Sequence, residues 1–169
     1  MKKVVLPVIM GFFFLFESSF VDVVPAEIFH KDQVFVPRFI LILSIFITIY
    51  QSKLGGILYG IILGLLYDVI YTEVLGVYMF SMPLIAYIIS QASRILQTNI
   101  IIISILSILG VVILEFFVFG VNLSIGVATM SFDRFLELRV LPTVILNSIF
   151  VTLFSFPFKK ILGKLQIEE

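Results

Sequence analysis

Five charged residues interrupt stretches of sequence that are otherwise strongly apolar. They are Glu17, Arg38, Asp68, Glu115 and Arg139. A charge at the centre of a membrane-spanning helix costs about 2.5–3.5 kcal/mol on insertion scales, so each of these groups is expected to face a protein interior or a partner. The planar guanidinium group binds a carboxylate through two parallel hydrogen bonds. We therefore expect the two Arg side chains to be the counter-ions of the three acids.

Such a cluster of buried charges has two interpretations. In the functional one, the charges line a polar cavity or form a docking site for another membrane helix. In the structural one, they form an ion-pair network that fixes the packing of the helices. The two interpretations can hold together, and the sequence does not choose between them.

The elements that carry these charges are six apolar stretches, each close to the roughly 20 residues that a helix needs to cross a bilayer. The predicted spans are Val4–Val21, Val34–Tyr50, Gly55–Thr72, Val74–Ser93, Ile100–Val121 and Arg139–Phe158. A helix rises by about 1.5 Å per residue, which places all five charges in one layer, about 20–28 Å from the inner boundary. We expect that layer to lie in the outer half of the membrane.

The composition predicts an all-α membrane protein. Of the 169 residues, 61% are hydrophobic, and the mean hydropathy is +1.23. This surplus of apolar surface is expected to face lipid, where helices satisfy all their own backbone groups. Lys2 and Lys3 precede the first apolar run without a convincing cleavage site, so we interpret that run as a retained span. We expect a single six-helix domain over residues 1–169.

The positive charges predict that both ends of the chain lie in the cytoplasm. With the N-terminus inside, the cytoplasmic side holds Lys2, Lys3, Lys53, Arg94, Lys159, Lys160 and Lys164. The outer loops then hold only Lys31 and Arg134. Positive residues in short loops favour the cytoplasmic side. The predicted localisation is a cytoplasmic membrane crossed several times by the chain.

The third predicted span carries a ladder of glycines at four-residue spacing, Gly56, Gly60 and Gly64. Glycines at this spacing form a flat groove where another helix can approach closely. We expect this groove to serve helix packing, with the neighbouring helix in the same chain or in a partner.

The sequence carries little that predicts catalysis. The Tyr67-Asp68 pair resembles half of an intramembrane aspartyl protease, but the second Gly-x-Gly-Asp segment is missing. With no Cys and one His, the chain offers few metal ligands. The net charge of zero does not indicate a nucleic-acid partner. We expect neither enzyme activity nor a cofactor.

Several stretches resemble the MreD family of bacterial rod shape-determining membrane proteins, in its Gram-positive form. They are Phe12–Glu17, Phe35-Val36-Pro37-Arg38-Phe39, Gly60-x-x-x-Gly64-Leu65-Leu66-Tyr67-Asp68-x-x-Tyr71-Thr72, Leu75-Gly76-Val77-Tyr78, Glu115, and Arg139-x-Leu141-Pro142-Thr143-x-x-Leu146-Asn147. These stretches are spread along most of the chain, from Phe12 to Asn147.

The resemblance implies a non-enzymatic subunit of the cell-wall elongation machinery that helps to maintain rod shape. It would bind MreC through a membrane helix and, through that complex, connect MreB filaments to RodA and its class B penicillin-binding protein. The implied fold is similar to the vitamin-binding S components of energy-coupling-factor transporters. No catalytic residues come with the family. Whether the chain also forms a homodimer is left open.

The alternative function is a small-solute, vitamin-type binding subunit of a transporter. The charge layer in the outer half would suit a pocket that is open to the outside. Against it, the first span lacks the Ala-x-x-x-Ala face by which such S components dock, and carries Phe12, Phe13, Phe14 and Phe16 instead.

Overall fold

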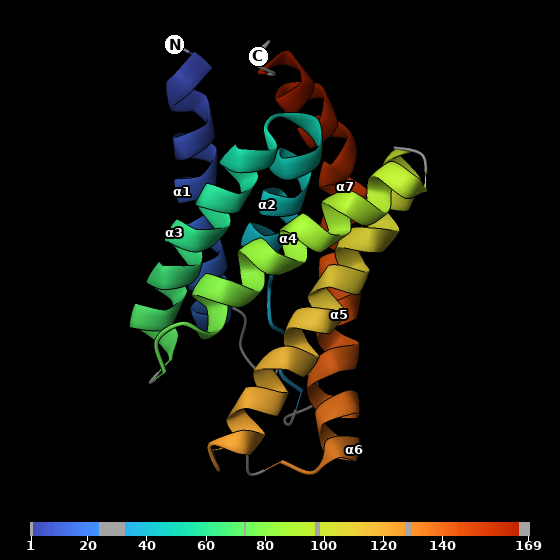
Figure 1. Cartoon of the computed structure of the whole chain (residues 1–169). Helices are drawn as coiled ribbons and strands as arrows, with labels where there is room; N and C mark the ends of the chain where they lie inside the picture. The colour runs from blue at the N-terminus through green and yellow to red at the C-terminus, as the bar shows by residue number, and fades with distance from the viewer. Residues whose placement is uncertain (1, 24–32, 73, 97–98, 128–129, 166–169) are drawn as a thin grey trace.

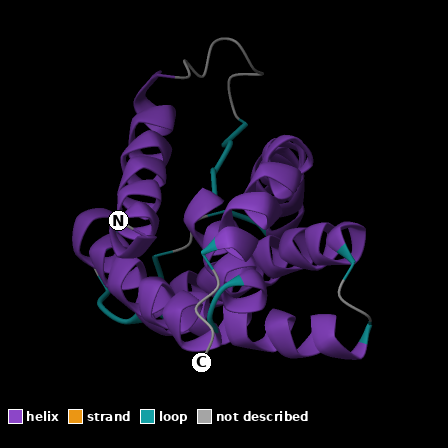
Figure 2. Cartoon of the chain, turned by 90° about the horizontal axis from the view of Figure 1, so that it is seen from above, coloured by secondary structure: helices purple, strands orange, loops and turns teal. Residues whose placement is uncertain are grey.

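The structure is a computed structural model that describes residues 2–23, 33–72, 74–96, 99–127 and 130–165. Helices make up nearly all of these residues, and none of the described residues forms a strand (Figure 2). The helices are α1 (Lys2–Val23), α2 (Phe39–Tyr50), α3 (Lys53–Tyr71), α4 (Val77–Ile95), α5 (Ile100–Ser124), α6 (Phe132–Phe135) and α7 (Leu141–Lys164). A π-helical segment, Leu136–Val140, joins α6 to α7.

The predictions that the chain is helical and that it has helices able to span a membrane are confirmed for the described residues. Three helical stretches are long and apolar enough to cross a bilayer, namely Lys53–Tyr71, Ile100–Ser124 and Phe132–Lys164. Two further apolar stretches, Val4–Phe20 and Phe39–Tyr50, are shorter. The six crossings and their orientation therefore stay predictions.

Helix α2 lies at the centre of the bundle. It contacts α1, α3, α4, α5 and α7, and every side chain from Phe39 to Thr48 is buried. In Figure 1 it lies behind α3 and α4. A helix that is apolar on all sides is stable when other helices surround it, which explains why the most uniformly apolar segment takes the central position.

The second predicted span is wrong at its start. Helix α2 begins at Phe39 rather than at Val34, and Pro37 precedes the helix instead of lying in its first turn. Residues 33–38 have no regular secondary structure. A residue before proline is disfavoured in the helical conformation, which opposes helix at Val36. With 12 residues, α2 is about 18 Å long, well short of the roughly 30 Å hydrocarbon core.

Helix α7 and its π-helical segment supply the hydrogen bonds that this irregular segment lacks. Pro142 has no backbone N–H, so the Leu138 carbonyl has no helical donor four residues on. The Val34 N–H donates to that carbonyl at 2.7 Å instead. The Val36 N–H donates to Thr143 Oγ1 at 3.2 Å. Non-helical backbone is tolerated at membrane depth only where protein satisfies it in this way.

The glycine ladder of α3 packs against helices of the same chain. A Cβ atom at Gly56 would overlap Thr48 of α2, and one at Gly60 would lie 3.2 Å from the Pro83 backbone of α4. At Gly64 it would lie 2.5 Å from the Tyr78 carbonyl oxygen. The absence of side chains at these three positions is what lets α2 and α4 approach α3 so closely.

Both ends of the chain lie at the same end of the bundle, with α6 at the opposite end (Figure 1). The C-terminal end of α3 and the N-terminal end of α4 lie away from the chain termini. The five charges that the sequence singled out belong to helices α1, α3 and α5, to the segment before α2, and to the π-helical segment.

Candidate functional site

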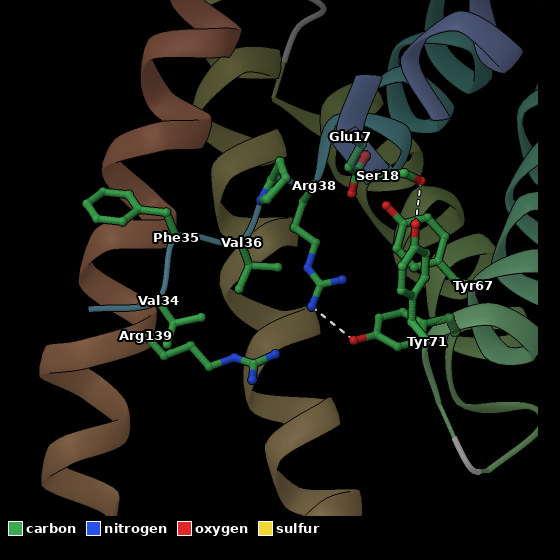
Figure 3. Close-up of a pocket in the computed structure, with 11 residues that line it drawn as sticks. Glu17, Ser18, Val34, Phe35, Val36, Arg38, Tyr67, Tyr71 and Arg139 are labelled. Atoms are coloured by element: carbon green, nitrogen blue, oxygen red, sulfur yellow. Dashed lines mark hydrogen bonds between the residues drawn. The ribbon is translucent and has the colours of Figure 1, made fainter. Parts of the chain in front are cut away.

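A cavity of about 480 Å³ lies where α1, the segment before α2, α3 and the π-helical segment meet (Figure 3). Its lining includes three of the five charged residues, Glu17, Arg38 and Arg139. The remaining lining residues are Ser18, Val34, Phe35, Val36, Pro37, Tyr67, Tyr71 and Tyr78. Glu17 is 3% exposed and Arg38 2% exposed, whereas the Arg139 side chain is 30% exposed.

Glu115 of α5 binds both Arg side chains. Its Oε1 accepts from Arg38 Nε and lies 2.7 Å from Arg38 Nη2 as well, and its Oε2 accepts from Arg139 Nε at 2.8 Å. Arg38 Nη2 also donates to the Tyr78 hydroxyl group at 3.0 Å. Glu115 is 1% exposed. The Glu115 carboxylate therefore joins the segment before α2 and the π-helical segment to α5, and Arg38 extends this connection to α4.

Glu17 caps the start of helix α2 from a different helix. Its Oε2 accepts from the Ile40 N–H at 3.0 Å. The first N–H groups of a helix have no partner within the helix, and the helix dipole favours negative charge there. Because α2 starts inside the bundle, the Glu17 carboxylate on α1 takes the place that water would take at an exposed helix start.

Asp68 caps the start of helix α4 in the same manner. It is fully buried, and its two oxygens accept from the N–H groups of Gly76, Tyr78 and Met79 at 2.8–2.9 Å. We expected an Arg counter-ion for this acid, and that expectation is wrong. The unpaired N–H groups at a helix start form charge-assisted hydrogen bonds with a carboxylate and so take the place of a counter-ion.

The structure thus brings Arg38, Glu115 and Arg139 into one ion-pair cluster and places Glu17 on the same cavity. Asp68 joins this group only through Tyr78, whose N–H binds Asp68 and whose hydroxyl group binds Arg38. The glycine ladder lies on α3, where Gly64 contacts the same Tyr78 backbone.

Sequence reasoning missed three contributors to the site, Tyr78, Thr143 and Asn147. Asn147 Oδ1 accepts from the Arg38 N–H at 2.9 Å, and its Nδ2 donates to the Val36 carbonyl at 2.9 Å. The signal was present in the sequence, since Asn147 and Thr143 are polar residues within an apolar span. Buried polar groups of this kind nearly always have a hydrogen-bond partner.

Most carboxylate oxygens of this arrangement already accept hydrogen bonds from the chain itself. Both Glu115 oxygens, both Asp68 oxygens and one Glu17 oxygen are already engaged by donors of the chain. Within the described part of the chain, no group of three or more His, Cys, Asp or Glu residues is arranged to hold a metal ion.

The chain is similar to known proteins of one family. The family model of the rod shape-determining protein MreD matches residues 2–165. The chain is 37% identical to the rod shape-determining protein MreD of Bacillus subtilis (strain 168), over 94% of this chain and 92% of that protein. It is 23% identical to the cell shape-determining protein MreD of Streptococcus pneumoniae, over 95% of this chain and 96% of that protein. No solved structure matches the chain. With its family model matched over nearly its whole length, this chain belongs to the MreD family of rod shape-determining membrane proteins.

Proposed function

We propose that the protein is a non-enzymatic membrane subunit of the bacterial cell-wall elongation complex, where it binds MreC and helps to maintain rod shape. Its role in shape determination rests on its family, which matches residues 2–165. Through MreC the subunit would be linked to MreB, to RodA and to the class B penicillin-binding protein that works with RodA. The single observation that carries the proposal is this family match over almost the full chain.

The proposed topology has six crossings of the cytoplasmic membrane in one domain, with both ends in the cytoplasm. The two ends of the chain lie at one end of the bundle, and α6, which carries Arg134, lies at the other (Figure 1). Lys53 begins α3 and Arg94 lies in the last turn of α4, on the side of the chain termini. This distribution supports a cytoplasmic face that is rich in positive charge.

A scaffold role, rather than catalysis, is supported by how the buried charges are used. Glu17 and Asp68 hold the starts of two helices, and Glu115 holds two Arg side chains. An acid or base in catalysis needs a lone pair or proton that is free to reach a substrate. Most of these groups are instead bound to the chain's own donors.

The membrane helix of MreC is proposed to bind on a face other than the glycine ladder. The ladder is filled from within the chain, because Gly56 faces α2 and both Gly60 and Gly64 face α4. By contrast, a Cβ atom at Gly11 of α1 would meet nothing within 4 Å. The neighbouring α1 side chains Val8, Phe12 and Leu15 are exposed and would face lipid or a partner helix.

The proposal is tested by co-expression of the tagged chain with MreC from the same organism and purification in mild detergent. We expect full-length MreC to be retained in a fixed ratio. A variant of MreC whose membrane helix is replaced by an unrelated one should be lost, as should an unrelated protein with one membrane helix. A chain that never retains MreC contradicts the proposal.

The cavity is the observation that favours the alternative function, a small-solute subunit of a transporter. That function predicts uptake of a solute by cells that express the chain together with a transporter. A chain that restores rod shape to cells lacking their own MreD, without any gain in uptake, would argue against transport and for the scaffold role.

A further inference from the structure

We propose that the cavity beside Glu17 is a binding site for a small zwitterionic group, one that carries an ammonium at one end and a phosphate or carboxylate at the other. The shape-determining role does not require such a site. The hydrogen-bond acceptor and the donors that the chain leaves unused lie on different residues around this cavity (Figure 3).

The cation end of the site is formed by Glu17 and two tyrosines. Glu17 Oε2 caps α2, but Oε1 is buried without a hydrogen-bond partner among the described residues. The Tyr67 hydroxyl group lies toward this carboxylate (Figure 3), and the centroid of the Tyr67 ring is 5.2 Å from that of Tyr71. A free carboxylate oxygen beside aromatic rings is the environment in which proteins bind ammonium groups.

The anion end of the site is formed by Arg139. Its Nε donates to Glu115, whereas its two terminal amino groups make no hydrogen bond to any described residue. Its side chain extends toward Arg38 and the cavity (Figure 3). An Arg group with free, parallel N–H donors binds phosphate or carboxylate in preference to other groups. Arg38 adds positive charge nearby, although Glu115 and Tyr78 engage its donors.

The size and the opening of the cavity suit a polar head rather than a whole lipid. Its volume of about 480 Å³ lies within the range of about 300–1,000 Å³ that is common for small-molecule sites. Val34 and Tyr71 line it and are also exposed, so the cavity opens to the surface between these two residues. This opening lies near the end of α3 that is away from the chain termini.

The same chemistry has two sources, the head group of an ethanolamine phospholipid in the membrane and a soluble zwitterion outside it. The purified full-length chain would be titrated in detergent with phosphatidylethanolamine and, separately, with phosphatidylglycerol of the same acyl chains. Native mass spectrometry would count the bound molecules. Soluble glycerophosphoethanolamine forms a third arm, read out by the shift in melting temperature.

We expect the ethanolamine lipid to bind about tenfold more tightly than the glycerol lipid, equivalent to about 1.4 kcal/mol. Glu17→Gln should remove that preference, since a Gln oxygen still caps α2 while its charge is lost. Arg139→Gln should weaken both lipids, and Tyr71→Leu at the opening should weaken the ethanolamine lipid most. Binding of the soluble probe with the same sensitivities would assign the site to a soluble ligand.

The matched controls are Asp133→Asn and Arg134→Gln, which neutralise exposed charges of α6 outside the cavity. Both should bind like the unmodified chain. Melting temperatures would show which variants are folded, and only folded variants would be compared. Equal binding of both lipids by the unmodified chain together with no effect of the soluble probe overturns the proposal, as does a preference that survives in folded Glu17→Gln and Tyr71→Leu variants.

Discussion

At the scale of single residues, the buried charges of this protein have partners of two kinds. Glu115 binds two guanidinium groups, whereas Glu17 and Asp68 bind backbone N–H groups at helix starts. The second kind explains how three acids and two bases share the interior without one Arg for each acid. A carboxylate that accepts several N–H bonds is stabilised by charge-assisted hydrogen bonds.

Asp68 is expected to be the most sensitive of the capping acids. Asp68→Ala leaves the N–H groups of Gly76, Tyr78 and Met79 without their acceptor inside the bundle. The Tyr78 N–H is buried and the other two are partly buried. A buried unsatisfied donor costs about 1–3 kcal/mol, so we expect a loss of about 2 kcal/mol or more in the free energy of unfolding. Denaturant titration in detergent, followed by circular dichroism, measures this loss.

Two variants serve as controls for the Asp68 prediction. Asp68→Asn keeps one oxygen acceptor and should lose less stability than Asp68→Ala. Lys164→Ala changes an exposed side chain in the last turn of α7 and should change the free energy by no more than about 0.5 kcal/mol. Equal stability of Asp68→Ala and Lys164→Ala would show that Asp68 does not cap α4.

At the scale of elements, the segment before α2, which has no regular secondary structure, positions Arg38 in the site. Residues 33–38 carry Arg38 into the centre of the bundle, and side chains of α7 satisfy their backbone. Asn147 makes two such bonds, to the Arg38 N–H and the Val36 carbonyl, and a third to the Thr143 carbonyl of its own helix. Its amide therefore replaces the hydrogen bonds that a continuous helix would have made.

Asn147→Ala is expected to destabilise the protein by about 2–4 kcal/mol, because it leaves two backbone groups of the segment before α2 unsatisfied. Thr152→Ala, on the exposed side of the same helix, removes only a bond to the Ser148 carbonyl and should be close to neutral. Thermal unfolding of both variants in the same detergent makes the comparison. If the two variants have the same melting temperature, the hydrogen bonds of Asn147 do not stabilise the segment before α2.

The glycine ladder gives a second prediction at this scale. Gly64→Ala places a Cβ atom 2.5 Å from the Tyr78 carbonyl oxygen and 2.9 Å from Met79 Cα, which are backbone atoms that cannot move aside without shifting α4. Overpacking of this kind costs about 1–3 kcal/mol. We expect a lower melting temperature and weaker packing of α3 on α4.

Gly11→Ala is the matched control, since its Cβ would meet nothing within 4 Å. Alanine is favoured over glycine within a helix by up to about 1 kcal/mol, so this variant should be unchanged or slightly more stable. Equal destabilisation by the two substitutions would mean that the effect comes from helix propensity rather than from the contact with α4.

The sequence predicted the helical elements better than it predicted the site. Hydropathy located the apolar stretches, because the cost of exposing polar backbone to lipid makes long apolar runs helical. It extended the second stretch back to Val34, because hydropathy does not register that Thr143 and Asn147 supply hydrogen bonds from a segment more than a hundred residues away. The partners of Asp68 were missed for a related reason. Every residue except proline has a backbone N–H group, so residue types do not show which of these groups bind a carboxylate.

At the scale of the whole molecule, the family match and the bundle describe the same unit. The matches to the two MreD relatives extend over more than 90% of this chain and of each relative. The helical bundle that holds the buried charges therefore lies almost entirely within the matched region. The central α2 contacts five other helices. Glu115 connects the segment before α2 to α5 and to the π-helical segment. The buried charges therefore connect elements that are far apart in the sequence.

The central claim is that these charges find their partners inside the bundle instead of facing lipid, and a double-mutant cycle on Arg38 and Glu115 tests it most directly. Arg38→Gln, Glu115→Gln and the double variant would be unfolded by denaturant in detergent, beside a control cycle of Glu115→Gln with the exposed Arg94→Gln. The structure predicts a coupling free energy of about 1–3 kcal/mol for Arg38 with Glu115 and close to zero for Arg94 with Glu115. Additive effects in both cycles would contradict it.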